Sequence, residues 1–373
     1  MYIFLEKIED VYSKYFDLGG SLIANIGNGT EAHITFFDAN FNPTCQITES
    51  SYTFLVTHDK LIFTTQVMSI NEEKIIQSYY YCLHSKALKK LDYTLSLDGL
   101  IYQNKLLCRA VTGDLSSNSQ KKWFEIDLNT LEVLNQWPNQ LGFLNSYGNY
   151  TGCQFYFGKA FISSAKSEGK IGLFDFNDEA FWQYDFTEEC RFINYDKIDR
   201  DENEHLPGQI QFIIPYGEDK ILVSCKYSKT FCIELSSGRI LWKNSFTGNR
   251  GYIIVGDIGF VYSNGGSIHK IDLITGESLH KDKHFYLLPE MPYYKDLHIS
   301  TATDTIVYHD GLLWGLIYSN GYSFVVAIHP DTYQYEWIHR VETYNKVMDI
   351  RFYNNRMYLH TSSSELYIYE KEN

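Results

Sequence analysis

Two short segments carry the residue types and spacings of metal ligands. Residues 199–203, Asp-Arg-Asp-Glu-Asn, place oxygen-bearing side chains at alternate positions, as the start of a calcium-binding loop does. The position that requires glycine holds Glu204, however, and the closing acidic position holds Ile210. His280 and His284 have the spacing of metal ligands on a helix, but their surroundings, His-Lys-Asp-Lys-His, show no helical pattern. We therefore expect no metal site.

Glycine-rich segments and His-Asp pairs could also carry chemistry, but their positions argue for turns. Residues 27–31 (GNGTE) and 263–267 (SNGGS) lie between expected strands, whereas a phosphate-binding loop is followed by a helix. The His-Asp pairs at 58–59 and 309–310 occupy equivalent turns. The sequence contains no Gly-x-Ser-x-Gly motif and no coupled Cys/His arrangement. We predict no catalytic residues.

These segments are embedded in a repeat, a short apolar strand that ends in an acid and is followed by a turn and another strand. The clearest copies are residues 124–137, 231–242 and 269–279, and the copy at 325–337 has His329 in the acidic place. The repeat recurs about eight times, and its spacing averages about 47 residues, the length of one four-stranded propeller blade with its loops. The aligned strand-end positions are Asp38, His84, Asp127, Asp175, Glu234, Asp272, His329 and Glu370.

Each unit is expected to contain four strands. One strand opens on polar turn residues, such as Asn104, Asp219 and Asp310, which tolerate the left-handed conformations of tight hairpins. Another apolar run lies upstream of it. The eighth unit supplies only three strands, so we expect the N-terminal strand (MYIFLEKI) to complete the last blade and close the ring.

The predicted fold is therefore all-β, a closed β-propeller of four-stranded blades. Eight blades are expected, and seven are the alternative because residues 14–50 form the least regular unit. The 31 tyrosines, 24 phenylalanines and only 7 prolines suit pleated strands, and helical periodicity is nearly absent beyond a possible turn at residues 6–15. No linker-like segment interrupts the array, so residues 1–373 are predicted to form a single domain.

Charge and cysteine usage limit the compartment and the partners. The net charge of −14 repels phosphate backbones, which argues against nucleic acid and favours a basic partner. No segment approaches the roughly 18 apolar residues that span a bilayer, and the acidic N-terminus does not resemble a secretory signal. The seven cysteines are scattered singly, mostly in expected strands. We expect a cytoplasmic protein without membrane contact.

Three units carry a more specific motif. Ala327, His329, Thr332 and Trp337 have the spacing Ala-x-Asp-x-x-Thr-Gly-x-x-x-Trp. The same offsets are found at Glu234, Ser237, Gly238 and Trp242, and at Asp272, Thr275 and Gly276 as far as the glycine. This motif resembles the pyrroloquinoline-quinone-type propeller repeat. The resemblance implies that the tryptophan docks on the neighbouring blade and that Thr-Gly makes the turn, so its roles are structural.

The resemblance does not extend to the quinone enzymes of that family. Those enzymes are secreted, calcium-dependent proteins with a disulfide between adjacent cysteines over the cofactor, whereas this sequence has no adjacent cysteine pair and no export signal. It is closer to the non-catalytic branch, so no cofactor is expected.

Long connections are expected at one end of the blades only. With strands named A to D outward from the axis, residues 66–74 and 112–122 are predicted B–C loops, and residues 188–208 and 281–300 are predicted D–A loops. Binding residues concentrate on such loops. Residues 188–208 are acidic, and residues 281–300 are rich in the aromatic and Met side chains that anchor protein interfaces. The predicted partner-binding residues are Asp196, Asp199, Asp201, Glu202, Glu204, Phe285, Tyr286, Met291, Tyr293 and Tyr294.

The sequence thus favours a non-enzymatic propeller that binds a basic protein. Its most concrete form is a bacterial cytoplasmic inhibitor or immunity-type protein, monomeric by itself, that neutralises a basic toxin or enzyme. The alternative is a propeller enzyme, or a carbohydrate- or small-ligand-binding protein, that uses the central pocket of the same face.

Overall fold

The chain folds as antiparallel β-sheets, and every named element of the described residues is a strand. The structure is a computed structural model of 373 residues that separates into two compact units. It describes residues 2–19, 21–27, 32–47, 51–57, 59–68, 74–95, 100–102, 104–113, 121–138, 154–157, 160–165, 169–175, 179–193, 205–245, 251–262, 268–279 and 303–372.

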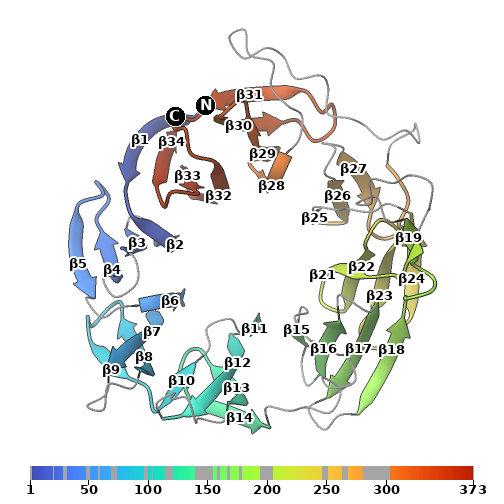
Figure 1. Ribbon diagram of the computed structural model, residues 1–373, viewed down its shortest axis with the longest axis horizontal. Coiled ribbons are helices and arrows are strands. Elements are labelled where there is room, and N and C mark those ends of the chain that lie inside the picture. Colours follow the sequence, from blue (N-terminus) through green and yellow to red (C-terminus); the bar gives the residue numbers. More distant parts are fainter. Residues whose placement is uncertain are drawn as a thin grey trace. The chain divides into compact units, whose positions relative to one another are not determined.

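Unit 1 comprises Met1–Asn139 and Arg351–Asn373 and holds four sheets (Figure 1). One consists of β1 (Tyr2–Ile8), β34 (Leu366–Lys371), β33 (Arg356–Thr361) and β32 (Val347–Tyr353). The boundary between the units falls within β32, after Ile350. The others are β2 (Val11–Asp17), β3 (Leu22–Ile26), β4 (His33–Phe37) and β5 (Pro43–Ile47); β6 (Ser51–Val56), β7 (Lys60–Met68), β8 (Lys74–Cys82) and β9 (Leu88–Lys90); and β10 (Tyr93–Leu95), β11 (Leu100–Tyr102), β12 (Lys105–Thr112), β13 (Lys122–Asp127) and β14 (Val133–Trp137).

Unit 2 comprises Gln140–Ile350. Its sheets are β15 (Gln154–Phe157), β16 (Ala160–Ala165), β17 (Lys170–Asp175) and β18 (Ala180–Asp185); β21 (Ile210–Tyr216), β22 (Lys220–Cys225), β23 (Thr230–Glu234) and β24 (Ile240–Asn244); β25 (Gly251–Val255), β26 (Ile258–Tyr262) and β27 (Ile268–Asp272); and β28 (Thr303–His309), β29 (Leu312–Ser319), β30 (Tyr322–Ile328) and β31 (Tyr335–Arg340). A two-stranded ribbon, β19 (Phe192–Ile193) with β20 (His205–Leu206), stands apart from them.

Tight hairpins connect the strands at one end of each sheet, as the polar turn residues predict. Asn104, Asp310 and Asn354 have φ angles of 61°, 49° and 54°, the left-handed region that Asn and Asp adopt more easily than most residues. The core lies between successive sheets. In unit 2, for example, side chains of β17 pack against β21, β22 and β23.

The strand β1 forms the outer edge of the last sheet in the chain. It pairs antiparallel with β34, from Tyr2 opposite Lys371 to Ile8 opposite Leu366, and Figure 1 shows the two strands side by side. The prediction that the N-terminal strand supplies the fourth strand of this sheet is therefore confirmed. The possible helical turn at residues 6–15 is wrong, because this stretch belongs to β1 and β2, whose alternation buries Val11 and Tyr15.

Most long connections lie between second and third strands or after fourth strands, as predicted, but the connection that includes residues 281–300 follows β27, the third and last strand of its sheet among the described residues. One prediction is too long: β7 and β8 extend to a Met68–Lys74 pair, so only residues 69–73 connect them instead of 66–74. A further long connection between β14 and β15, residues 138–153, was missed although its sequence is rich in Asn and Gly. Most of it lies outside the described residues.

The acid at the end of the third strand holds the following turn closed. The Oδ1 atom of Asp127 accepts hydrogen bonds from the backbone N–H groups of Asn129 (2.7 Å) and Thr130 (3.0 Å). The Nδ1 atom of His329 does the same for Asp331 (3.2 Å) and Thr332 (3.4 Å), so this imidazole replaces the carboxylate as an acceptor. These side chains stabilise turns and are not free for catalysis.

The alignment of His84 with these acids is wrong by two residues. Cys82 pairs with Lys60 in β7, just as Asp127 pairs with Lys105 in β12. The Cys82 thiol accepts hydrogen bonds from Ser85 and from the backbone of His84, which lowers the pKa of the thiol. Cysteine therefore occupies the acidic position of this unit.

Candidate functional site

All ten predicted partner-binding residues lie outside the described residues. Five belong to residues 194–204 and five to residues 280–302. The structure does describe both ends of the acidic segment, residues 188–193 and 205–208, together with the sheet that carries them. We call Thr187–Ile193 and His205–Gly208, with the residues they contact in β21–β24, the root of the insertion.

Backbone hydrogen bonds hold the root in place, one between its two chain segments and one within the turn that begins it. The N–H of Gly208 donates to Thr187 O (2.8 Å), and the N–H of Cys190 donates to Phe186 O (2.9 Å). A side chain at position 208 would bring its Cβ within 2.9 Å of the Cys190 Cβ, so only glycine fits this crossing. The path of the chain into and out of the insertion is thereby fixed.

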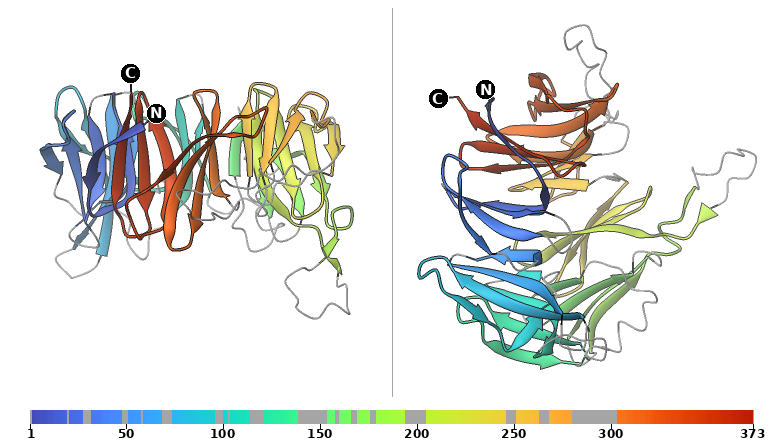
Figure 2. Two further views of the ribbon diagram at one scale, coloured as in Figure 1. Left: turned by 90° about the horizontal axis from the view of Figure 1, so that it is seen from above. Right: turned by 60° about the vertical axis from the view of Figure 1, so that its left-hand side comes forward.

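Beyond this crossing the insertion continues as a ribbon. Phe192 pairs with Leu206 and Ile193 pairs with His205, in antiparallel register. Figure 2 shows the ribbon, in yellow-green, projecting away from the sheet of β21–β24. The two paired strands are the last described residues on either side of positions 194–204.

An ion-pair network fastens the root to the sheet. Oε1 of Glu189 lies 3.1 Å from Nζ of Lys229 and 3.0 Å from Nζ of Lys243. The hydrogen bonds from Lys243 and then Lys229 hold the pKa of the Glu189 carboxyl below its usual range. Because this pKa is lower in the folded protein than in the unfolded chain, the stabilisation is present above the unfolded value and is lost as the pH falls through the folded one.

Aromatic and cationic side chains pack beside the ribbon. The rings of Phe192 and Tyr227 lie 5.7 Å apart, and Lys226 Nζ stands 5.4 Å from each of their centroids. Tyr227 has a φ of 52°, a backbone conformation that is rare for a bulky residue. Such strained residues persist where the surrounding contacts hold them, and here the turn presents the tyrosine ring to the ribbon.

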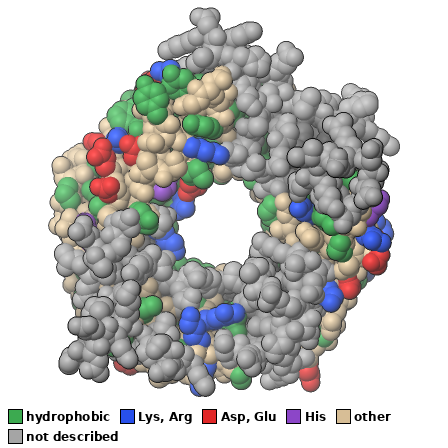
Figure 3. Space-filling model, viewed as in Figure 1, with side chains coloured by type: hydrophobic (Ala, Val, Ile, Leu, Met, Phe, Trp, Pro, Cys, Tyr) green, Lys and Arg blue, Asp and Glu red, His purple; other side chains and the backbone are tan. Residues whose placement is uncertain are grey.

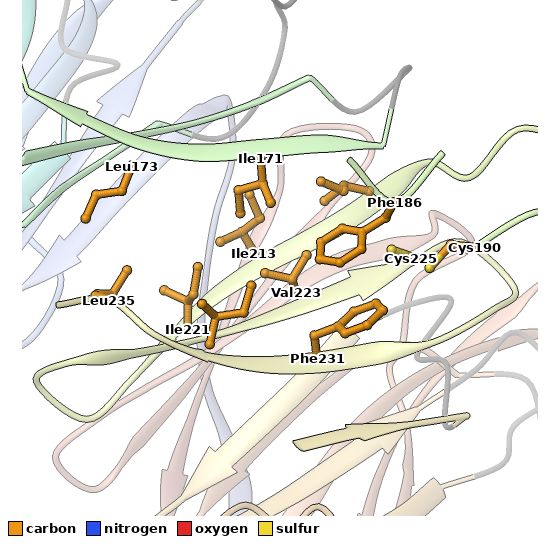
Figure 4. Packing of buried hydrophobic residues seen from close by; sticks show 12 residues of the cluster. Ile171, Leu173, Phe186, Cys190, Ile213, Ile221, Val223, Cys225, Phe231 and Leu235 are labelled. Atoms are coloured by element: carbon orange, nitrogen blue, oxygen red, sulfur yellow. The ribbon is translucent and has the colours of Figure 1, made fainter. Parts of the chain in front are cut away.

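Buried side chains complete the attachment. Phe186 stacks on Phe231 with ring centroids 4.2 Å apart, and Cys190 packs against Cys225 in the same core (Figure 4). Sequence reasoning found the acids of the insertion but missed this basic and apolar root. Lys229 and Lys243 are visible in the sequence, but only the fold places them beside Glu189.

A second open feature lies in unit 1, beside the outer strand β14. It is a groove of about 640 Å³ that Phe124, Leu131 and Val133 line with apolar surface. Asp92 and Glu132 lie at its exposed sides. The remaining lining residues are Tyr93, Thr112, Leu134 and Gln136. None of them was predicted as functional, because the sequence places no chemical motif at these positions.

The described residues contain no set of side chains that could ligate a metal ion. No group of three His, Cys, Asp or Glu side chains that could hold an ion occurs among them, and His280 and His284, which were not expected to bind a metal, lie outside them. Lys/Arg, Asp/Glu and hydrophobic side chains are interspersed on the described part of the face in Figure 3. In the part of the chain that the structure describes, no helix is long and apolar enough to span a lipid bilayer.

Comparison with known proteins identifies the fold. No protein-family model and no curated protein matches the sequence. Among solved structures, BamB from Moraxella catarrhalis, a PQQ-like β-propeller repeat protein, has a TM-score of 0.54 at 13% identity, over 99% of this chain and 100% of that one. The computationally designed protein Ika8 has a TM-score of 0.57 at 8% identity, over 98% of each chain. The antiparallel four-stranded sheets and this likeness show that the chain has a β-propeller fold.

Proposed function

We propose that this propeller is a protein-binding module whose partner is basic and is engaged by the acidic insertion. The observation that carries the proposal is the root. Backbone hydrogen bonds, the Glu189 ion pairs and the buried core fix the base of a segment that otherwise carries a concentration of carboxylates. A rigid base reduces the conformational entropy that binding would cost, and carboxylates accelerate association with a cationic surface.

Ring closure completes this proposal. The described residues contain eight sheets of three or more strands, and we propose that they are eight blades of one closed ring, with β1 making the closing contact. Closure would protect the inner sheet edges and leave the long connections at one end as the binding face. Small-angle X-ray scattering should then give the profile of a compact disc, whereas an open array would give a larger radius of gyration.

In its most specific form, the protein is a cytoplasmic, monomeric inhibitor of immunity type that blocks a basic toxin or enzyme. This proposal rests on charge. The chain carries a net charge of −14, and residues 196–204 contain all five predicted contact acids. The aromatic residues 285–294 would supply a second, apolar contact. No covalent chemistry is required of the protein in this role.

The proposal is tested by charge reversal with a matched control. The variant Asp199→Lys/Asp201→Lys/Glu202→Lys should lose at least tenfold in capture of the basic protein that wild-type protein retains from a lysate of the source organism. The control variant reverses three exposed acids in turns at the opposite end of the sheets, Glu179→Lys/Glu218→Lys/Glu277→Lys, so that its net charge is identical.

The two variants separate site-specific binding from general electrostatic attraction. If both lose the partner equally, attraction by net charge explains the capture and the insertion is not the site. If neither loses it, the basic-partner proposal is wrong. Loss in the first variant alone, with an unchanged circular dichroism spectrum, supports it.

A further inference from the structure

Two cysteine side chains meet in the core of unit 2. Cys190 lies in the root, just after β18, and Cys225 is the last residue of β22, 35 positions later in the chain. Both are fully buried members of the same apolar cluster, and Figure 4 shows their sulfur atoms facing each other. Both are free thiols in the structure. Each of them therefore has the other as a neighbour that could complete a disulfide.

The surroundings of the two thiols favour ionisation of Cys190 over ionisation of Cys225. The Cys225 thiol hydrogen-bonds to Cys190, which lowers the pKa of Cys190 and raises that of Cys225. Burial opposes ionisation of Cys190, but the Ser228 side chain and the charge of Lys229 favour it. Because the thiolate is the reactive form, Cys190 is the thiol that attacks an oxidant, and Cys225 is placed to resolve the product.

The backbone holds both residues in place for this reaction. The N–H of Cys190 donates to Phe186 O (2.9 Å), and the N–H of Cys225 donates to Lys229 O (2.8 Å). Gly208 closes against the Cys190 Cβ from the other chain of the root. Both backbones are therefore held in place where the two side chains meet.

We propose that Cys190 and Cys225 form a reversible intrachain disulfide, which locks the root of the insertion to β22. With a peroxide as oxidant, the Cys190 thiolate attacks one peroxide oxygen, the O–O bond breaks, and protonation of the leaving oxygen gives water and a sulfenic acid. Cys225 then attacks that sulfur, the S–O bond breaks, and the hydroxide leaves as water with the Cys225 proton. Two thiols and one peroxide yield one disulfide and two waters, and a small-molecule thiol reverses the reaction.

The other described cysteines provide contrasts within the same molecule. Cys232 is equally buried in the adjacent strand β23, and burial raises its pKa to about 11. Cys108 in unit 1 is also buried, with a pKa raised to about 12. Burial disfavours the reactive thiolate of each, so neither is expected to form a disulfide. We therefore expect a disulfide between Cys190 and Cys225 and none at Cys232 or Cys108.

The bond can be detected directly by peptide mapping. Purified full-length protein is treated with hydrogen peroxide, its remaining thiols are alkylated, and it is digested with trypsin without reduction. Cleavage after Lys170, Arg191, Lys220 and Lys226 releases peptides 171–191 and 221–226, which should appear as one linked species that dithiothreitol separates. The oxidised protein should melt about 5 °C above the reduced protein.

Matched variants decide the result. Cys232→Ser should leave the linked peptide and the melting shift intact, whereas Cys225→Ser, which retains a hydrogen-bond donor, should abolish both. A folded wild-type protein that yields no linked species, or that accumulates sulfinic acid on Cys190 alone, would overturn the proposal. The crosslink is measured on the isolated protein, so its outcome is independent of whether the insertion binds a partner.

Discussion

Two junctions between sheets in unit 2 are closed by tryptophan, whereas one junction in unit 1 is not. Trp242 of β24 donates from Nε1 to Leu273 O (2.8 Å) in the next sheet, and Asn244 donates to Gly276 O (3.0 Å). Trp182 of β18 donates in the same way to Leu235 O (2.8 Å). In both junctions an indole from an outer strand lies on the turn of the following sheet, as the resemblance to quinone-type repeats implies.

The junction between the β6–β9 and β10–β14 sheets has a different composition. Register places Lys89 opposite Tyr80, where Trp242 stands opposite Cys232. The receiving turn has Leu131 in the place of Gly276. A lysine crosses the junction instead, since Lys60 Nζ donates to Asn129 O (2.7 Å). The groove beside β14 lies at this junction.

The difference shows that tryptophan and glycine act as a pair. A Cβ at Gly276 would lie 2.5 Å from the Trp242 ring, so the indole can dock only where the turn has no side chain. Both Gly276 and Leu131 have positive φ, 75° and 62°, a conformation that costs a leucine roughly 1 kcal/mol. Where no indole arrives, a side chain in the receiving turn is tolerated.

The largest effect is expected from removing an indole. Trp242→Ala should lower the free energy of unfolding by about 3 kcal/mol, because it deletes a nearly buried ring and its hydrogen bond. Lys89→Ala, at the equivalent position, should change it by about 0.5 kcal/mol or less because this side chain is exposed. Urea denaturation followed by circular dichroism measures both. Equal losses would mean that the two junctions do not differ in kind.

Filling the receiving turn should be the next most damaging change. Gly276→Leu recreates the unit 1 turn in unit 2, but its side chain would displace Trp242, so we expect a loss of about 2 kcal/mol. Indole fluorescence should shift to longer wavelength as Trp242 becomes hydrated. If both the stability and the spectrum are unchanged, the pairing of tryptophan with glycine is wrong.

Emptying the turn of unit 1 should have a smaller effect. Leu131→Gly removes a buried side chain but also relieves its left-handed backbone, so the two contributions partly cancel and leave a loss of about 1 kcal/mol. The same denaturation experiment measures it. A loss as large as that of Trp242→Ala would show that Leu131 seals its junction as firmly as the indole does.

The sequence predicted the sheets well because the repeat carries its own register. Glu234 and Asp272 end their strands where the alternation predicts, and Gly238 and Gly276 follow at the turn. The register failed at Cys82, because the segment YYYCLHSKALKK contains no acid and the nearest polar candidate was His84. Only the pairing with Lys60 shows that a thiol accepts the turn hydrogen bonds there.

The root and the groove could not be predicted for a related reason. Glu189, Lys229 and Lys243 are distant in sequence, and only the crossing at Gly208 brings the first of them to the sheet. The groove is lined by residues of β10, β12, β13 and β14 and of the turns beside them, which only the folded sheet brings together.

The smallest expected effect is also the most direct test of the pairing. If an indole needs an empty turn, Lys89→Trp should be neutral alone but should gain stability in the Leu131→Gly background, with a coupling of about 0.5 kcal/mol in a double-mutant cycle. The gain is expected to be modest because the β8–β9 pairing lacks the register shift that precedes Trp242 in β23–β24, and that bulge aims the indole. Additive variants would indicate that the bulge, and not the glycine, determines whether tryptophan can close a junction.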